Sequence, residues 1–116
     1  MTLYMVRAKP KNDLSGLRKE LESGKLSKLR PFGETLHHGL QNARFHTNNN
    51  YAMWVEEDYC SPSLAMERES VLDEYFDDKT VDQVRSEDEG WNKIQDKPSL
   101  WIRWLFPFLL QSLFPD

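Results

Sequence analysis

The chain is poor in the residues that would identify several large classes of protein. One cysteine among 116 residues excludes an internal disulfide framework and is typical of a reducing cytoplasm. Fifteen Lys and Arg against 19 Asp and Glu give a net charge of −4, so we do not expect the basic face that nucleic acid requires. The five glycines form no phosphate-binding loop. A cytoplasmic protein without a nucleic-acid partner is therefore predicted.

Long apolar runs are scarce as well. The N-terminus, residues 1–9, is too short and charged too early for a signal peptide. The most apolar stretch, Leu100–Phe114, is shorter than the roughly twenty residues of a transmembrane helix, and Arg103 and Pro107 interrupt it. We expect it to dock on its own domain or across a dimer, because an exposed patch this apolar aggregates; contact with a membrane surface is the weaker alternative. The chain thus divides into one domain, residues 1–98, and an apolar aromatic tail, residues 99–116.

The first part of the chain predicts a strand followed by a helix. Leu3–Ala8 is a compact apolar run that Pro10 closes. Asp13 can cap a helix whose leucines recur at helical spacing, and Gly24 stands where such a helix would end. A short helical turn over residues 26–29 is expected to continue it.

The centre of the chain is a junction between a strand and a helix. Tyr51–Tyr59 begins with a two-residue alternation over five residues and is rich in aromatic and β-branched types, a pattern that predicts a half-buried strand. Ser61 is then expected to cap a helix that extends to Phe76. Arg68 falls in the middle of the apolar face of this helix. Because an unpaired buried charge is costly, we expect a structural ion pair between Arg68 and Glu57. The alternative is that the Arg68 head group reaches water over its apolar stem.

Residues 34–46 fit two interpretations. Three apolar residues have helical spacing, but Gly39 in the middle of the segment and the asparagine-rich turn after it favour a β-hairpin, which we predict. A three-residue loop would pair Thr47 with Tyr51. This register places six side chains on one polar face of the sheet: His38, Asn42, Arg44, His46, Trp54 and Glu56.

The end of the domain completes the predicted fold. Thr80–Val84 is a short fourth strand, and Ser86–Gly90 is interpreted as a solvated acidic turn. The order strand, helix, hairpin, helix, strand is that of an α+β, ferredoxin-like βαββαβ domain, an antiparallel sheet with both helices on one face. The other face would be bare, so we expect two copies to close face to face as a homodimeric α/β barrel.

Three motifs carry a resemblance to known proteins. The run Trp54–Glu69, with Arg30–Gly33 and Asn42–Arg44 upstream, resembles a family of small uncharacterised bacterial proteins over about Tyr4 to Leu100. The overall pattern resembles the dimeric α/β-barrel superfamily, which includes cofactor-independent oxygenases of the antibiotic-biosynthesis type. The resemblance implies the fold and a homodimer, and it implies no cofactor.

The polar sheet face is the candidate ligand site. Arg44 could hold an anionic or enolic oxygen, His38 or His46 could exchange a proton near neutral pH, and Trp54 could form a wall. Glu56 could act as a general base if it is desolvated. The competing interpretation is a set of cross-strand ion pairs in a self-satisfied interface.

Other sites are weaker hypotheses. Cys60 is expected to be a small buried hydrophobe rather than a nucleophile, because no oxyanion-hole signature accompanies it. The pair His37 and His38, with His46 and Glu56, has ligand types for zinc but no diagnostic spacing, so no metal is expected. We therefore predict a homodimer that binds a small organic ligand, with or without cofactor-independent chemistry. The alternative is a non-catalytic assembly module that uses the apolar tail.

Overall fold

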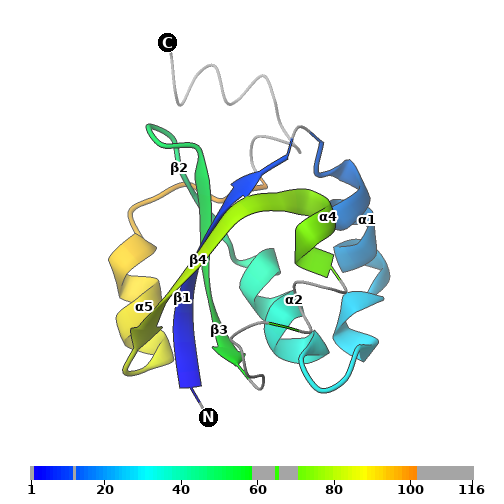
Figure 1. Ribbon diagram of the computed structural model, residues 1–116, viewed down its shortest axis with the longest axis horizontal. Helices are drawn as coiled ribbons and strands as arrows, with labels where there is room; N and C mark the ends of the chain where they lie inside the picture. The colour runs from blue at the N-terminus through cyan, green and yellow to red at the C-terminus, as the bar shows by residue number, and fades with distance from the viewer. Residues whose placement is uncertain (1, 12, 59–64, 66–70, 102–116) are drawn as a thin grey trace.

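The computed structural model describes residues 2–11, 13–58, 65 and 71–101, and these form an α+β domain around one antiparallel sheet (Figure 1). The strands run in the order β2-β3-β1-β4, which is compatible with a ferredoxin-like fold. The elements are β1 (Thr2–Pro10), α1 (Ser15–Ser23), the 3₁₀ helix η1 (Leu26–Lys28), α2 (Gly33–Gln41), β2 (Arg44–His46), β3 (Tyr51–Asp58), α4 (Asp73–Tyr75), β4 (Phe76–Val84) and α5 (Glu87–Ile94).

The sheet separates two apolar clusters. In Figure 1, α1, α2 and α4 lie on one side of it and α5 lies on the other. We call the side of α1 and α2 the inner face; the sheet residues that are buried there include Val6, Ala8, Ala52 and Trp54. The side of α5 is the outer face, whose buried residues are Met5, Met53, Val55, Val84 and Ile94. Both clusters follow from the twofold alternation of side chains along each strand.

The predicted start of the domain is confirmed. The apolar run of β1 forms the centre of the sheet, where Val6 pairs with both Trp54 and Val81. The predicted cap is displaced by one residue, because Leu14 occupies the N-cap position of α1 and its side chain makes no capping hydrogen bond. The Asp13 side chain accepts a hydrogen bond from the backbone N–H of Ser15 at 2.9 Å, which lowers the pKa of this carboxyl. The helix ends at Gly24, whose φ of 76° places it in the left-handed conformation that glycine adopts most readily.

The predicted hairpin over residues 34–46 is wrong for most of its length. Residues 33–41 form α2, and only Arg44–His46 forms a strand. The turn spans four residues, 47–50, so that His46 rather than Thr47 pairs with Tyr51, and the predicted register is displaced by one residue.

Gly39, which counted against a helix in the sequence, allows α2 to pack against the sheet. A Cβ on Gly39 would lie 2.7 Å from Cδ1 of Trp54 and 3.0 Å from the backbone oxygen of Val55. The absence of a side chain therefore lets α2 approach β3 closely, while Leu36 and Leu40 are fully buried beneath the helix. Tertiary packing thus decides the conformation of a segment whose local signals were mixed.

The predicted acidic turn is also wrong, since its residues begin α5. Ser86 accepts a hydrogen bond from the backbone N–H of Glu89 at 3.1 Å. Three acidic residues in the first turn then lie at the positive end of the helix dipole. Gly90 brings the helix onto the sheet, because a Cβ there would lie 2.5 Å from Cγ2 of Val55. Helix α5 therefore covers part of the outer face, which the sequence predicts to be bare.

The segment after α5 covers the edge of β2. The backbone N–H of Phe45 donates to the oxygen of Pro98 at 2.9 Å, and that of Leu100 donates to the oxygen of Ala43 at 2.9 Å. Trp101 is buried, and its Nε1 donates to the backbone oxygen of Leu40 at 2.6 Å. Leu100 and Trp101 therefore belong to the inner core. Residues 102–116, Cys60 and the expected partner Arg68 lie outside the described residues.

Candidate functional site

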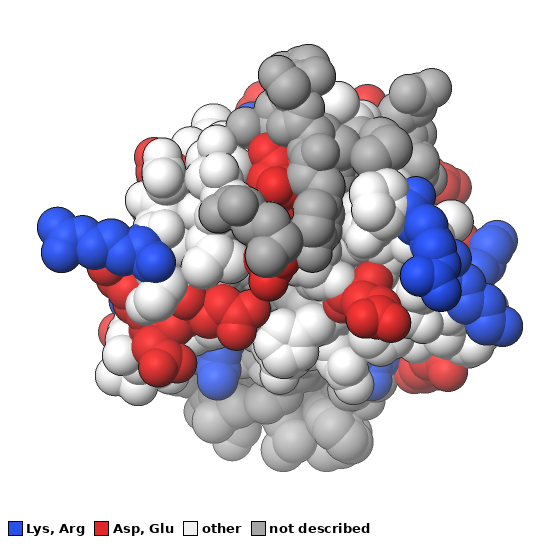
Figure 2. Space-filling model, turned by 90° about the horizontal axis from the view of Figure 1, so that it is seen from below, with Lys and Arg blue, Asp and Glu red and all other residues white. Residues whose placement is uncertain are grey.

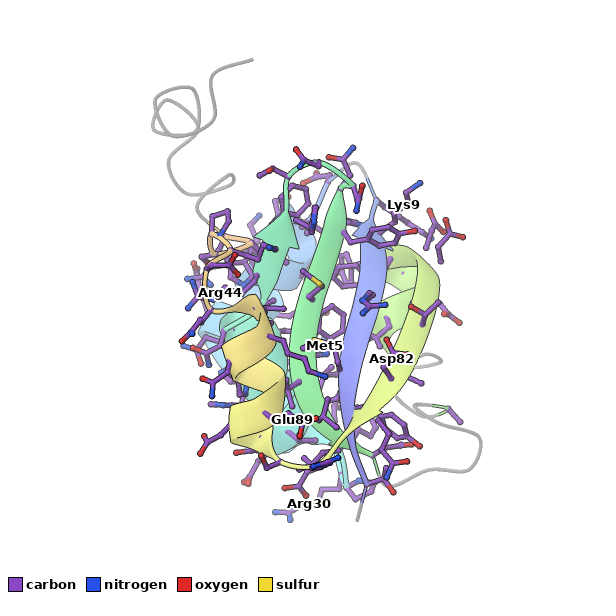
Figure 3. All side chains as sticks on the ribbon, turned by 90° about the vertical axis from the view of Figure 1, so that its left-hand side faces the viewer. Met5, Lys9, Arg30, Arg44, Asp82 and Glu89 are labelled. Atoms are coloured by element: carbon purple, nitrogen blue, oxygen red, sulfur yellow. The ribbon has the colours of Figure 1, made fainter. Side chains whose placement is uncertain are left out.

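The outer face carries a pocket of about 570 Å³ between α5, the β2–β3 hairpin and the strands β1 and β4. Figure 3 looks onto this face: α5 crosses one side of the sheet, while β1 and β4 lie beside it without a helix in front of them. The pocket is lined by Met5, Arg7, His46, Asn49, Tyr51, Met53, Thr80, Asp82, Val84, Lys93, Ile94 and Lys97. Its volume is in the range of pockets that hold small ligands.

The floor of the pocket is apolar. Met5, Met53, Val84 and Ile94 line it, and each of them is at most 7% exposed. The two methionines come from neighbouring strands, and unbranched thioether side chains adapt their shape to what they contact. The floor therefore suits the hydrocarbon part of a ligand without selecting one shape.

The rim of the pocket is charged. Nη1 of Arg7 lies 3.0 Å from Oδ2 of Asp82 across two strands, and about half of each side chain is exposed. Lys93 lies 3.7 Å from Glu89 on the surface of α5, and Lys97 lies 3.3 Å from Asp96. Each of these three ion pairs includes one side chain that is at least 60% exposed. Pairs so open to water contribute little to stability, so the cations can exchange partners at small cost.

One imidazole on the rim has an unsatisfied nitrogen. Nδ1 of His46 is shielded from water and has no hydrogen-bond partner among the described residues. Buried polar atoms of this kind are rare in folded proteins and call for an explanation. His46 pairs across the hairpin with Tyr51, which also lines the pocket and carries Lys9 5.9 Å above its ring.

The structure divides the six predicted ligand residues among three places. His46 lines the pocket described above. A shallower hollow of about 280 Å³, between α2 and α5, contains three more of them, His38, Asn42 and Arg44. Trp54 and Glu56 lie on the inner face, because residues 54 and 56 alternate with the outer residues 53 and 55. The prediction that these side chains share one polar face is therefore wrong. The turn is longer by one residue than predicted, so Arg44 and His46 share a face with Met53 and Tyr51 instead of with Trp54 and Glu56.

The groups in the shallow hollow are held by neighbouring atoms. Nη1 of Arg44 donates to the backbone oxygen of Lys97 at 2.9 Å, and Nδ2 of Asn42 donates to the backbone oxygen of His38 at 2.9 Å. The His38 ring meets the ring of Trp91 edge to face, with centroids 6.1 Å apart. These contacts join α2, β2 and the end of α5, so the three predicted residues serve the packing of the fold.

Trp54 and Glu56 form a buried pair. Nε1 of Trp54 donates to Oε1 of Glu56 at 2.7 Å, and the two residues are 0% and 1% exposed. A buried indole N–H needs an acceptor, and this carboxylate supplies one. The sheet separates both side chains from the outer pocket, so neither can serve there as a wall or a base.

The lining residues that sequence reasoning missed come from β1, β4, the β2–β3 hairpin with β3, and α5 with the segment after it. Met5 and Arg7 share a face by simple alternation, and this signal was available once β1 had been assigned. Lys93 and Lys97 could be found only by recognising α5, whose start is encoded by Ser86 and Glu89 in the pattern of a capping box.

No family model, curated protein or solved structure matches the chain. In the part of the chain that the structure describes, no three His, Cys, Asp or Glu side chains are grouped so that they could hold a metal ion. Within the same residues, no helix has the length and apolar character needed to cross a bilayer.

Proposed function

We propose that this protein binds a small organic ligand in the outer pocket. The observation that supports the proposal is an apolar floor beneath a polar rim in a pocket of about 570 Å³. Such a combination binds the hydrocarbon part of a ligand by burial and orients its polar part by a few contacts. Of the predicted ligand residues, the proposal retains His46; any cofactor-independent chemistry would use the imidazole of His46 or the hydroxyl of Tyr51.

A homodimer with ferredoxin-like protomers is part of this proposal. The antiparallel order β2-β3-β1-β4 supports the fold. In Figure 3, the outer face of β1 and β4 lies beside α5 and is not covered by it. Two copies that met through this part of the sheet would enclose both pockets.

Filling the pocket should abolish binding without unfolding the domain. Thr80 is exposed and lines the pocket, so Thr80→Trp would place an indole in it. We expect the affinity for an eight-carbon ligand to fall at least about tenfold, equivalent to about 1.4 kcal/mol. The measurement is a titration of octan-1-ol, octanoate, octyl phosphate and octylamine, followed by the methyl NMR signals of Met5, Met53, Val84 and Ile94.

The matched control is Gln83→Trp, an exposed position on the same strand whose side chain points to the inner face. It should leave binding unchanged. If none of the four compounds moved the methyl signals, or if Thr80→Trp bound them as well as the native chain, the proposed pocket would be abandoned.

The alternative function is assembly through the tail, and its test must spare the core. Since Leu100 and Trp101 are buried in the domain, the tail should be removed after residue 101. We expect the chain of residues 1–101 to keep its fold and, if the outer face makes the dimer, to remain a dimer, with a mass by light scattering of twice that of the shortened chain. A deletion that converted a dimer into monomers would favour the assembly function instead.

A further inference from the structure

We infer that the ligand of the outer pocket is an amphipathic anion, an apolar chain or ring system that ends in a carboxylate or phosphate. The inference rests on the proposed function, because it names the chemical class that the same pocket would select. Three observations support it: the charge of the lining, the position of the two lysines, and the opposite position of the one carboxylate.

The lining is cationic in an acidic protein. Three of its side chains are cations, Arg7, Lys93 and Lys97, and one is a carboxylate, Asp82. The whole chain carries a net charge of −4, and acidic side chains gather on the end of the molecule where β4 leads into α5 (Figure 2). The positive lining is therefore local, and it opposes the charge of the rest of the molecule. A concentration of one charge around an apolar floor attracts a ligand of the other charge.

The two lysines occupy one wall. Lys93 lies in the last turn of α5, and Lys97 follows four positions later. The backbone of Lys97 is fixed on both sides, because its N–H donates to the oxygen of Ile94 at 3.0 Å and its oxygen accepts from Arg44 at 2.9 Å. Ile94 itself belongs to the pocket floor. Both ammonium groups thus extend from a rigid base beside the apolar surface.

The present partners of these lysines are weak competitors. Glu89 and Asp96 are surface carboxylates that do not line the pocket, and their contacts with the lysines measure 3.7 and 3.3 Å. Exposed pairs of this kind are worth about 0–1 kcal/mol. An anionic group that was partly desolvated by its own apolar chain would interact more strongly with the same ammonium groups, so it should displace the surface partners.

The carboxylate of the lining sets the direction of the ligand. Asp82 lies on β4, across the face from α5 (Figure 3), and it is paired with Arg7. Within the lining, that pair balances the charge of the β1–β4 side, whereas the α5 side contributes two lysines whose carboxylate partners, Glu89 and Asp96, lie outside the lining. The anionic group should therefore lie against Lys93 and Lys97, and the apolar part should extend over Met5 toward Val84.

The four eight-carbon compounds test this selection because they share a chain and differ in charge. We expect octanoate or octyl phosphate to bind about tenfold more tightly than octan-1-ol, since one charge-assisted contact contributes about 1.5 kcal/mol, and octylamine to bind most weakly. The order of octanoate and octyl phosphate identifies the anion, and either order agrees with the inference. If neither octanoate nor octyl phosphate bound more tightly than octan-1-ol, the anion preference would be overturned while the pocket itself stayed established.

Charge removal provides the second test. The double variant Lys93→Gln/Lys97→Gln should lose the roughly tenfold advantage of the anions and bind octan-1-ol as before. The matched control is Lys19→Gln/Lys28→Gln, which removes the same charge from two exposed positions outside the pocket. A loss of anion binding in both double variants, or in neither, would contradict the assignment of the two pocket lysines. Binding of no compound by the native chain would reject the inference and the proposed function together.

Discussion

Replacing Trp101 with alanine is expected to lower the free energy of unfolding by about 3–5 kcal/mol, the usual cost of removing a buried tryptophan. The side chain is 2% exposed and packs with the inner cluster, and its Nε1 donates to the backbone oxygen of Leu40 at 2.6 Å. The Arg18 guanidinium lies 5.4 Å above its ring. Urea denaturation followed by far-UV circular dichroism measures the change. A loss of this size is a large part of the stability of a small domain.

A more conservative change separates packing from hydrogen bonding. Trp101→Phe keeps much of the apolar volume and removes the N–H donor, so it should cost about 1–3 kcal/mol. If Trp101→Ala were nearly as stable as the native chain, residues 97–101 would not be anchored in the core as the structure places them.

The second large effect is expected at Trp54. The alanine variant should lose about 3–5 kcal/mol of stability, because Trp54 is fully buried and packs against Phe76 at a centroid distance of 5.2 Å. It would also remove the N–H that donates to the buried carboxylate of Glu56. The same denaturation experiment measures this loss.

Trp54→Phe tests the location of the side chain rather than its size. On the inner face it should be less destabilising than alanine, and the affinity of the outer pocket for octanoate should change less than about twofold, because the sheet lies between them. A folded Trp54→Phe variant that no longer bound octanoate would restore Trp54 to the ligand site, against the register seen here.

The parts of the fold that were predicted correctly are those with strong local signals. The run Leu3–Ala8, the left-handed Gly24 and the strand from Tyr51 each depend on residues close in sequence. The helix α2 was missed because its decisive contact is distant: Gly39 makes room for Trp54 and Val55, and no local pattern shows which backbone it approaches. An isolated glycine inside a helical pattern is ambiguous for this reason.

The candidate site was more sensitive to error than the fold. A turn of four residues instead of three leaves the hairpin in place but exchanges the faces of its two strands relative to each other. Arg44 and Trp54 were consequently assigned to one face although they lie on opposite faces. The acidic run after Ser86 was interpreted by its charge alone, and the missed helix α5 then removed Lys93 and Lys97 from consideration.

The central position of β1 has a consequence for how the chain is made. This strand is the first of the sheet in sequence, yet one of its neighbours is β4, which ends at Val84. At a synthesis rate of 5–20 residues per second, roughly 4 to 15 s separate the completion of the two strands on the ribosome. During that interval the apolar alternation of β1 lacks one edge partner, a condition in which nascent chains aggregate or recruit chaperones. The first strand of the chain therefore gains its second neighbour only when the last strand has been made.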